Sequence, residues 1–259
     1  MKIQDLKGKN IGLVLSGGGV RGMAHIGILK ALNEHDIYPD VISGVSAGAI
    51  VGALYANGKM PLGMLAFFKE TPLFKYNFFS VNRPGLFDTE KYLFFFEKYF
   101  GEDSFGSLEK KLFVTATDLQ RGKSRTFSSG ELLRPLLASA ALPPVFCPVS
   151  IDGVLYADGG IMNNFPMEPL VDQCDIIIGC YTSALKEVGK AQLKNPLQLT
   201  DRTNMLMLHS NCREKLDACD TLFRPKGLEY IRMLDKKGIE KAFMIGYEHA
   251  SRCLDDIDY

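Results

Sequence analysis

One pattern occurs twice near the start of the chain. In each case a five-residue apolar run is followed by a turn of glycine and serine residues and then by a predicted helix. The first run covers residues 11–15 and is closed by the turn at 16–19, before a helix predicted over about 21–35. The second run covers residues 41–45 and precedes a helix of small residues predicted over 47–57. Short apolar strands that alternate with helices are typical of a parallel sheet whose two faces are both covered. The sequence therefore predicts an α/β fold with a mostly parallel central sheet.

The rest of the chain continues this alternation, and we expect one domain over residues 1–259. Further strands are predicted at 112–117, 125–128, 145–150, 154–157 and 175–180. Residues 196–259 are predicted to be a C-terminal helical part, because apolar positions from Ile239 onward recur with a 3.6-residue period. The longest uncharged run, residues 41–58, has the length of a membrane span. Its four glycines and its division into strand and helix favour buried core instead.

Charge balance and the N-terminus argue against several classes of protein. The charges of the 30 basic and 30 acidic residues cancel. The chain therefore lacks the excess of basic residues that would indicate a nucleic-acid partner. Residues 1–7 carry charges where an export signal needs an apolar stretch, so we expect a cytoplasmic protein. The 6 cysteines show no metal-ligand spacing, and we expect neither a metal nor another cofactor. These features leave the oligomeric state open.

The first turn, which we call the glycine loop, fits the G-x-G-x-x-G pattern of dinucleotide-binding loops. It consists of Gly17, Gly18, Gly19, Val20, Arg21 and Gly22. A dinucleotide site also needs an acidic residue at the end of the second strand, but Asp40 precedes that strand and a serine follows it. We therefore keep the dinucleotide site as an alternative and favour another use of the loop. Successive glycine N–H groups beside a helix N-terminus can also hold a developing oxyanion.

Ser46 lies in the pentapeptide Gly44-Val45-Ser46-Ala47-Gly48, which matches G-x-S-x-G between a predicted strand and a predicted helix. In that context, Gly44 and Gly48 permit the strained turn that exposes a nucleophilic serine. The N–H of Ala47, at the start of the helix, can donate to an oxyanion. Ser46 is therefore the candidate nucleophile.

The base that would activate Ser46 is harder to choose, because the chain has only 4 histidines. His25 and His35 fall within the first predicted helix and near its end. An ordinary α/β-hydrolase places its serine after several strands and its histidine late in the chain, whereas Ser46 follows the second strand. His209 and His249 lie on predicted helices, and a triad that uses one of them remains an alternative.

Two Asp-Gly steps lie close together in the second half of the chain. Asp152-Gly153 separates two short apolar runs and predicts a hairpin turn. Asp158 follows a predicted strand and is itself followed by Gly159 and Gly160, so its carboxylate can project from the sheet. Burial raises the pKa of a carboxylate, and a close hydrogen bond to a serine then permits proton transfer. Although most Asp-Gly steps are simple turns, Asp158 is the candidate base.

The motifs at 17–22, 44–48 and 158–160, in this order, resemble those of the patatin-like phospholipase family. Segments 112–119 and 138–146 are also similar to family segments, so the resemblance extends from about residue 10 to about residue 180. It implies a three-layer α/β/α sandwich and a Ser-Asp dyad that works without histidine.

By this resemblance Ser46 is the nucleophile and Asp158 the base. The backbone amides of residues 17–19 would form the oxyanion hole, with Arg21 as the residue that orients them. One local departure is Pro144, which stands where many relatives have a small residue and which affects the acyl pocket.

Residues 67–100, which we call the aromatic segment, hold thirteen of the 17 Phe and 10 Tyr residues. The three Phe residues at 94–96 would point in different directions around a helix, so they cannot all lie on one core-facing stripe. We interpret the segment as a lid or wall over a fatty-acyl channel, or as a contact with a membrane. The alternative is that it packs the core or a dimer interface.

Together these features predict a serine lipid acyl hydrolase that acts through an acyl-enzyme on Ser46. The expected substrates are phospholipids, lysophospholipids or related acyl esters, with peripheral membrane contact. An acyltransferase that uses the same two residues is the alternative.

Overall fold

The computed structural model of the chain describes residues 8–72, 78–183 and 185–256. Residues 1–7, on which the expectation of no export signal rests, lie outside the described residues. Phe74 and Tyr76 of the aromatic segment lie outside them as well.

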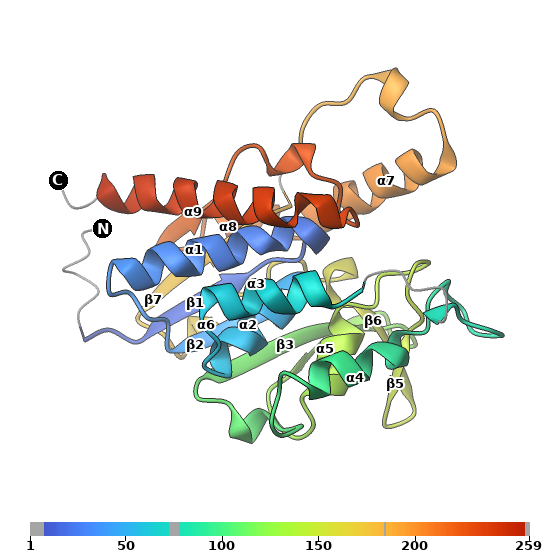
Figure 1. The fold of residues 1–259 in the computed structure, drawn as a ribbon, viewed down its shortest axis with the longest axis horizontal. Coiled ribbons are helices and arrows are strands. Elements are labelled where there is room, and N and C mark those ends of the chain that lie inside the picture. Colours follow the sequence, from blue (N-terminus) through green and yellow to red (C-terminus); the bar gives the residue numbers. More distant parts are fainter. Residues whose placement is uncertain (1–7, 73–77, 184, 257–259) are drawn as a thin grey trace.

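A central sheet of eight strands runs through the molecule in the order β5-β6-β3-β2-β1-β7-β8, with β4 paired to β3 (Figure 1). β3, β2, β1, β7 and β8 are parallel neighbours. β4, β5 and β6 pair antiparallel. The strands are β1 (Ile11–Leu15), β2 (Val41–Val45), β3 (Lys111–Asp118), β4 (Lys123–Phe127), β5 (Val149–Ile151), β6 (Val154–Asp158), β7 (Ile176–Cys180) and β8 (Thr221–Phe223).

Helices cover both faces of this sheet. Alternate residues of a strand point to opposite faces, and both sets of residues are buried in β1. Leu13 and Leu15 of β1 join a core built with α1, α2 and α9, whereas Val14 joins a second core built with α6 and α8. The expected fold, a mostly parallel sheet between helices, is confirmed. The helices are α1 (Met23–Glu34), α2 (Ala47–Ala56), α3 (Pro61–Glu70), α4 (Leu93–Glu97), α5 (Leu133–Ser139), α6 (Glu168–Val171), α7 (Pro196–Ser210), α8 (Arg213–Leu216) and α9 (Ile239–Asp255).

The region before β5 is where the sequence prediction differs most from the structure. The strand expected over 145–150 is wrong in its first four residues, since β5 begins only at Val149. Pro148 has no N–H to donate to a ladder, and the N–H of Val145 bonds instead to the carbonyl of Leu142 at 3.1 Å. The hairpin predicted at Asp152-Gly153 is confirmed: it joins β5 to β6, and both residues have positive φ.

The C-terminal part contains more than the expected helices. The periodic run from Ile239 forms α9, as predicted. The same part also supplies β8, which extends the parallel sheet beside β7. Sequence reasoning missed β8 because a strand of three residues is too short to show a periodic pattern.

α1 and α9 lie side by side across one face of the sheet (Figure 1). Their backbones meet at two glycines, one on each helix. A Cβ built on Gly27 would lie 2.1 Å from the carbonyl oxygen of Phe243, and one built on Gly246 would lie 2.2 Å from that of Ala24. Side chains are therefore excluded from both positions.

We expect Gly246→Ala to lower the free energy of unfolding by about 1–3 kcal/mol, because the added methyl group forces α1 and α9 apart. The matched control is Gly63→Ala in α3, where a Cβ would meet nothing within 4 Å. That change is expected to stabilise the fold by about 0.5–1 kcal/mol, as Gly→Ala does in an open helix position. Urea unfolding followed by circular dichroism measures both, and equal stability of the two variants would contradict the close helix contact.

Candidate active site

Ser46 occupies a strained turn between the end of β2 at Val45 and the start of α2 at Ala47. Its φ is 54° and its ψ is −127°, a conformation that L-residues seldom adopt. The turn is this tight because its flanking glycines touch backbone. A Cβ on Gly44 would lie 2.7 Å from the carbonyl oxygen of Gly48, and one on Gly48 would lie 2.3 Å from that of Leu15. The elbow expected from the G-x-S-x-G pattern is therefore present.

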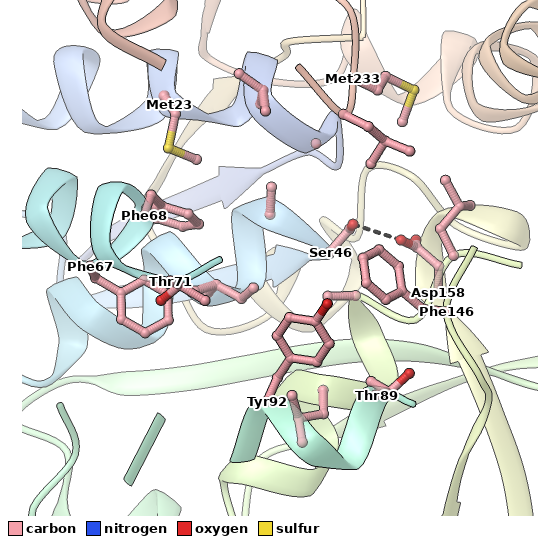
Figure 2. Close-up of a pocket in the computed structure, with 18 of the residues that line it drawn as sticks. Met23, Ser46, Phe67, Phe68, Thr71, Thr89, Tyr92, Phe146, Asp158 and Met233 are labelled. Carbon is pink, nitrogen blue, oxygen red and sulfur yellow. Dashed lines mark hydrogen bonds between the residues drawn. The ribbon is translucent and has the colours of Figure 1, made fainter. Parts of the chain in front are cut away.

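Asp158, at the end of β6, accepts a hydrogen bond from the hydroxyl of Ser46, with 2.6 Å between Oγ and Oδ2 (Figure 2). Its other oxygen, Oδ1, accepts from the N–H of Gly160 at 2.8 Å. The carboxyl group is buried, with 3% of the residue exposed. Burial raises the pKa of Asp158 to about 6, although the bonds from Ser46 and Gly160 act in the opposite direction. The pair thus combines a hydroxyl with a carboxylate that is more basic than one in water.

The backbone around Asp158 is held against the adjacent strand β3. The hydroxyl of Thr117 donates to the carbonyl of Asp158 at 2.9 Å. A Cβ on Gly159 would lie 2.1 Å from the carbonyl oxygen of Thr115, so only glycine fits beside β3. A Cβ on Gly160 would lie 2.6 Å from the side chain of Leu208. The two glycines after Asp158 therefore serve close packing as well as the turn.

Ser139, at the end of α5, connects Ser46 to the sheet, and sequence reasoning did not identify it. Its hydroxyl accepts from the N–H of Ser46 at 2.8 Å and donates to the carbonyl of Thr115 at 2.6 Å. All three residues are buried. Ser139 lies in the segment 138–146, which resembles a family segment, but no local pattern identifies a serine as a bridge between two backbones.

The glycine loop is fixed through its carbonyl groups. The carbonyl of Gly17 accepts from the hydroxyls of Thr182 at 3.1 Å and Ser183 at 2.7 Å, both just after β7. The carbonyl of Gly18 accepts from the N–H of Arg21 at 3.2 Å. Gly19 has a φ of 56°, and a Cβ there would lie 2.3 Å from the carbonyl oxygen of Met233. These bonds and contacts hold the loop without using the N–H groups of its first three residues.

The N–H groups of the first three loop residues and of Ala47 have no acceptor within the described part of the chain. Gly17, Gly18, Gly19 and Ala47 are the four residues expected to form an oxyanion hole. A Cβ on Gly17 would lie 3.4 Å from the Cβ of Ser46, and one on Gly22 would lie 2.7 Å from the Cβ of Ala47. The glycine loop and the Ser46 turn are therefore in direct contact.

Asn164 is a second residue near the pair that the sequence did not indicate. It is fully buried, and neither polar atom of its side chain has a hydrogen-bond partner among the described residues. Its Oδ1 would lie 2.4 Å from a Cβ on Gly17 and 3.0 Å from one on Gly160. Asn164 thus fills the space between the glycine loop and the turn after Asp158.

Arg21 was expected to orient the amides of the glycine loop, and its side chain anchors a neighbouring segment. Its Nε donates to the carbonyl of Ile231 at 2.7 Å, and its Nη1 lies 3.5 Å from the sulfur of Met205. The N–H of Val20 bonds the carbonyl of Met233 at 2.7 Å. The loop and residues 231–233 are consequently joined at two points.

The histidines have other partners than Ser46. The Nε2 of His25 lies 2.8 Å from the carbonyl oxygen of Ser16, and burial lowers the pKa of His25 to about 4. The Nδ1 of His209 lies 2.6 Å from the hydroxyl of Tyr181. The Nε2 of His249 accepts from the N–H of Arg224 at 3.3 Å. No described hydrogen bond joins a histidine to Ser46, so the geometry does not favour the triad alternative.

The dinucleotide alternative requires an acidic residue at the C-terminal end of β2, and the structure does not place Asp40 there. Asp40 lies before β2, and its carboxylate accepts from the N–H of Ile11 at 2.8 Å. Both groups are at the N-terminal ends of their strands, whereas the glycine loop follows the C-terminal end of β1. β2 itself ends in Val45 and is followed by Ser46, so it supplies no acidic residue for a ribose.

An apolar cleft with a volume of about 130 Å³ leads to Ser46 and Asp158 (Figure 2). Four members of the aromatic segment line it together with one aromatic residue from outside that segment. They are Phe67, Phe68, Tyr92, Phe96 and Phe146. Other members of the segment pack on one another, as Phe78 does on Tyr92 with ring centroids 4.8 Å apart. The aromatic segment therefore contributes both a wall of the cleft and part of the core.

No group of three or more His, Cys, Asp and Glu side chains among the described residues is arranged to hold a metal ion. None of their helices has the length and hydropathy needed to cross a membrane.

Comparisons with known proteins found a family model and several relatives, and the family model covers the glycine loop, Ser46 and Asp158. A family model described as patatin-like phospholipase matches residues 13–171. An uncharacterized NTE family protein of Mycobacterium bovis is 29% identical over 225 residues, which cover 86% of this chain and 62% of the relative. A lysophospholipase of Aspergillus niger is 33% identical over 172 residues, which cover 63% of this chain and 11% of that protein. The chain thus spans less than two thirds of the length of these relatives.

Among solved structures, VipD from Legionella pneumophila has a similar fold. The TM-score is 0.55 at 16% sequence identity, over 95% of this chain and 67% of that one.

We expect Ser139→Ala to lower the free energy of unfolding by about 1–3 kcal/mol, because it leaves the buried N–H of Ser46 without this partner and removes the bond to the carbonyl of Thr115. Ser210→Ala is the matched control, since the exposed Ser210 hydroxyl bonds only the carbonyl of Met207 within its own helix. That control is expected to change stability by less than about 0.5 kcal/mol. Urea unfolding measures both variants, and a Ser139→Ala protein as stable as the control would contradict the bridging role.

Proposed function

We propose that this chain, which belongs to the patatin-like phospholipase family, hydrolyses carboxylic esters of phospholipids, lysophospholipids or related acyl lipids. The observation that carries the proposal is the 2.6 Å hydrogen bond between the hydroxyl of Ser46 and the buried carboxylate of Asp158. This pair lies at an apolar cleft suited to a fatty-acyl chain. The lysophospholipase named above as a relative supports the same substrate class.

In the proposed reaction, Ser46 Oγ attacks the ester carbonyl while Asp158 Oδ2 takes its proton. The carbonyl oxygen becomes an oxyanion and accepts hydrogen bonds from the N–H groups of Gly18, Gly19 and Ala47, with Gly17 next to them. When the tetrahedral intermediate collapses, Asp158 returns the proton to the leaving alcohol. The acyl group remains on Ser46 as an ester.

Water then repeats the sequence on the acyl-enzyme. Asp158 takes a proton from the water as it attacks the Ser46 ester, and it returns that proton to Oγ when the fatty acid leaves. A raised pKa favours this double role, because proton transfer is most efficient when the pKa of the base is near the working pH. A pKa of about 6 places Asp158 in that range.

The apolar cleft supplies the binding energy for the acyl chain. Phe67 and Phe68 of α3 lie at the end of the cleft away from Asp158, and Phe146 lies next to the pair (Figure 2). Burial of apolar area stabilises a bound chain by about 25 cal/mol per Å². In this proposal the aromatic segment is the wall of the acyl pocket.

An acyltransferase would use the same acyl-enzyme and pass the acyl group to an alcohol or thiol instead of water. Analysis of products with added acceptors distinguishes the two. The cytoplasmic location and peripheral membrane contact expected from the sequence stay predictions.

We expect a fluorophosphonate probe to label the wild-type protein and to leave Ser46→Ala unlabelled. Asp158→Asn should lower kcat by ~10²–10⁴-fold, because it removes the general base. Asp152→Asn, the same change at the exposed hairpin turn, serves as the matched control and should retain activity. If Asp158→Asn keeps full esterase activity while His209→Ala or His249→Ala abolishes it, a histidine is the base instead.

The pH dependence of kcat/KM tests the state of Asp158. Only the ionised carboxylate can accept the proton of Ser46, so kcat/KM should rise with pH through about 6 and level off above it. His209→Ala should keep the same rising limb. A rate that stays constant from about pH 4.5 to 8 would show that no base of raised pKa controls the step.

A further inference from the structure

A second cavity lies next to the reactive cleft and differs from it in character. Its volume is about 280 Å³, larger than the 130 Å³ of the cleft. Basic side chains line this cavity, whereas aromatic side chains line the cleft, so we call it the basic cavity. Its walls come from the loop after β7, from α7 and from the segment before α9.

Four basic side chains line the basic cavity. Arg21 belongs to the glycine loop and bonds the carbonyl of Ile231, and the other three come from three separate segments. Lys186 lies on the loop after β7, Arg202 on α7 and Arg232 before α9. Nη1 of Arg202 donates to the carbonyl of Lys186 at 2.9 Å, and the ammonium of Lys186 lies 4.1 Å from the ring centroid of Tyr230. These contacts orient Lys186 and Arg202 but neutralise neither charge.

The lining offers little negative charge to balance these cations. No described carboxylate forms an ion pair with Lys186, Arg202 or Arg232. The one acidic residue in the described lining is Glu229, whose Oε2 accepts from the N–H of Gly227 at 2.8 Å. A cavity walled by like charges favours an anionic occupant, because bringing the cations together is otherwise unfavourable.

The basic cavity shares a wall with the reactive cleft. Ile231 and Arg232 line the basic cavity, while Met233 and Leu234 line the cleft. The wall is tied to the glycine loop by the bond from Arg21 Nε to the Ile231 carbonyl. A group bound in the basic cavity would therefore lie against a segment that is bonded to the glycine loop.

We propose that the basic cavity binds a phosphate-bearing anion through Lys186, Arg202 and Arg232. A phosphomonoester carries a charge of about −1.5 to −2 at pH 7, whereas a carboxylate carries a single charge and would balance only one of the cations. Planar guanidinium groups match phosphate oxygens in a two-point geometry, and a lysine adds a mobile point charge. The phosphate can come from a lipid headgroup or from a soluble phosphorylated molecule.

The test measures binding separately from catalysis by using the Ser46→Ala protein. Isothermal titration with inorganic phosphate and with glycerol 3-phosphate, at constant ionic strength, covers the soluble source. Sedimentation with vesicles that contain phosphatidate, compared with pure phosphatidylcholine vesicles, covers the lipid source. Since neither assay depends on hydrolysis, its result is independent of whether the proposed esterase activity is correct.

Each assay is repeated with Arg202→Gln/Arg232→Gln and with the control Arg213→Gln. Arg213 lies exposed on α8 outside both cavities, so the control changes the same kind of charge elsewhere. We expect the double variant to weaken binding at least ~10-fold and the control to leave it unchanged. If the double variant does not fold by circular dichroism, the single change at the exposed Arg232 replaces it.

The two arms identify the source of the phosphate. Arginine-dependent binding of either soluble probe supports the proposal with a free ligand, and arginine-dependent binding of phosphatidate vesicles alone supports it with a lipid headgroup. The proposal is overturned if no probe binds. It is equally overturned if the double variant binds as wild type does, or if Arg213→Gln loses as much affinity as the double variant.

Discussion

The register of β3 against its two neighbours is the constraint on which the contact between Ser46 and Asp158 depends. Ser46 and Asp158 are 112 positions apart in the chain. Thr115 of β3 pairs with Val45, and the next residue of β3 pairs with Asp158. Consecutive positions of one strand therefore hold the serine turn on one side and the carboxylate on the other. A slip of one residue in either pairing would turn a side chain to the opposite face and separate the two groups.

Burial gives the Asp158 carboxylate a basicity that it would not have in water. An exposed aspartate has a pKa near 3.9 and is a poor base for a hydroxyl. Desolvation raises the pKa of Asp158 to about 6, and two hydrogen bonds keep the ionised form accessible. In the proposed reaction, burial of Asp158 takes the part that an imidazole has in a triad. The histidines of the described chain have other hydrogen-bond partners.

The glycine loop is supported through its carbonyls, which leaves its N–H groups to a ligand. Hydroxyls after β7 hold the carbonyl of Gly17, and the segment that contains Met233 packs against Gly19. Because that segment also forms the wall between the cleft and the basic cavity, the loop is mechanically linked to both. One short stretch of chain therefore positions the expected oxyanion donors and separates two cavities of opposite character.

The sequence by itself determined the features that depend on local backbone conformation. The elbow around Ser46, the glycine loop, the hairpin at Asp152 and the alternation of strands and helices follow from glycine placement and apolar periodicity within a few residues. Only the tertiary structure decided which groups meet. Ser139 and Asn164 carry no local pattern, and β8 is too short for one. The raised pKa of Asp158 likewise depends on the residues that exclude water around it. These properties arise from strand register and packing between segments far apart in the chain, and a local pattern contains no information on either.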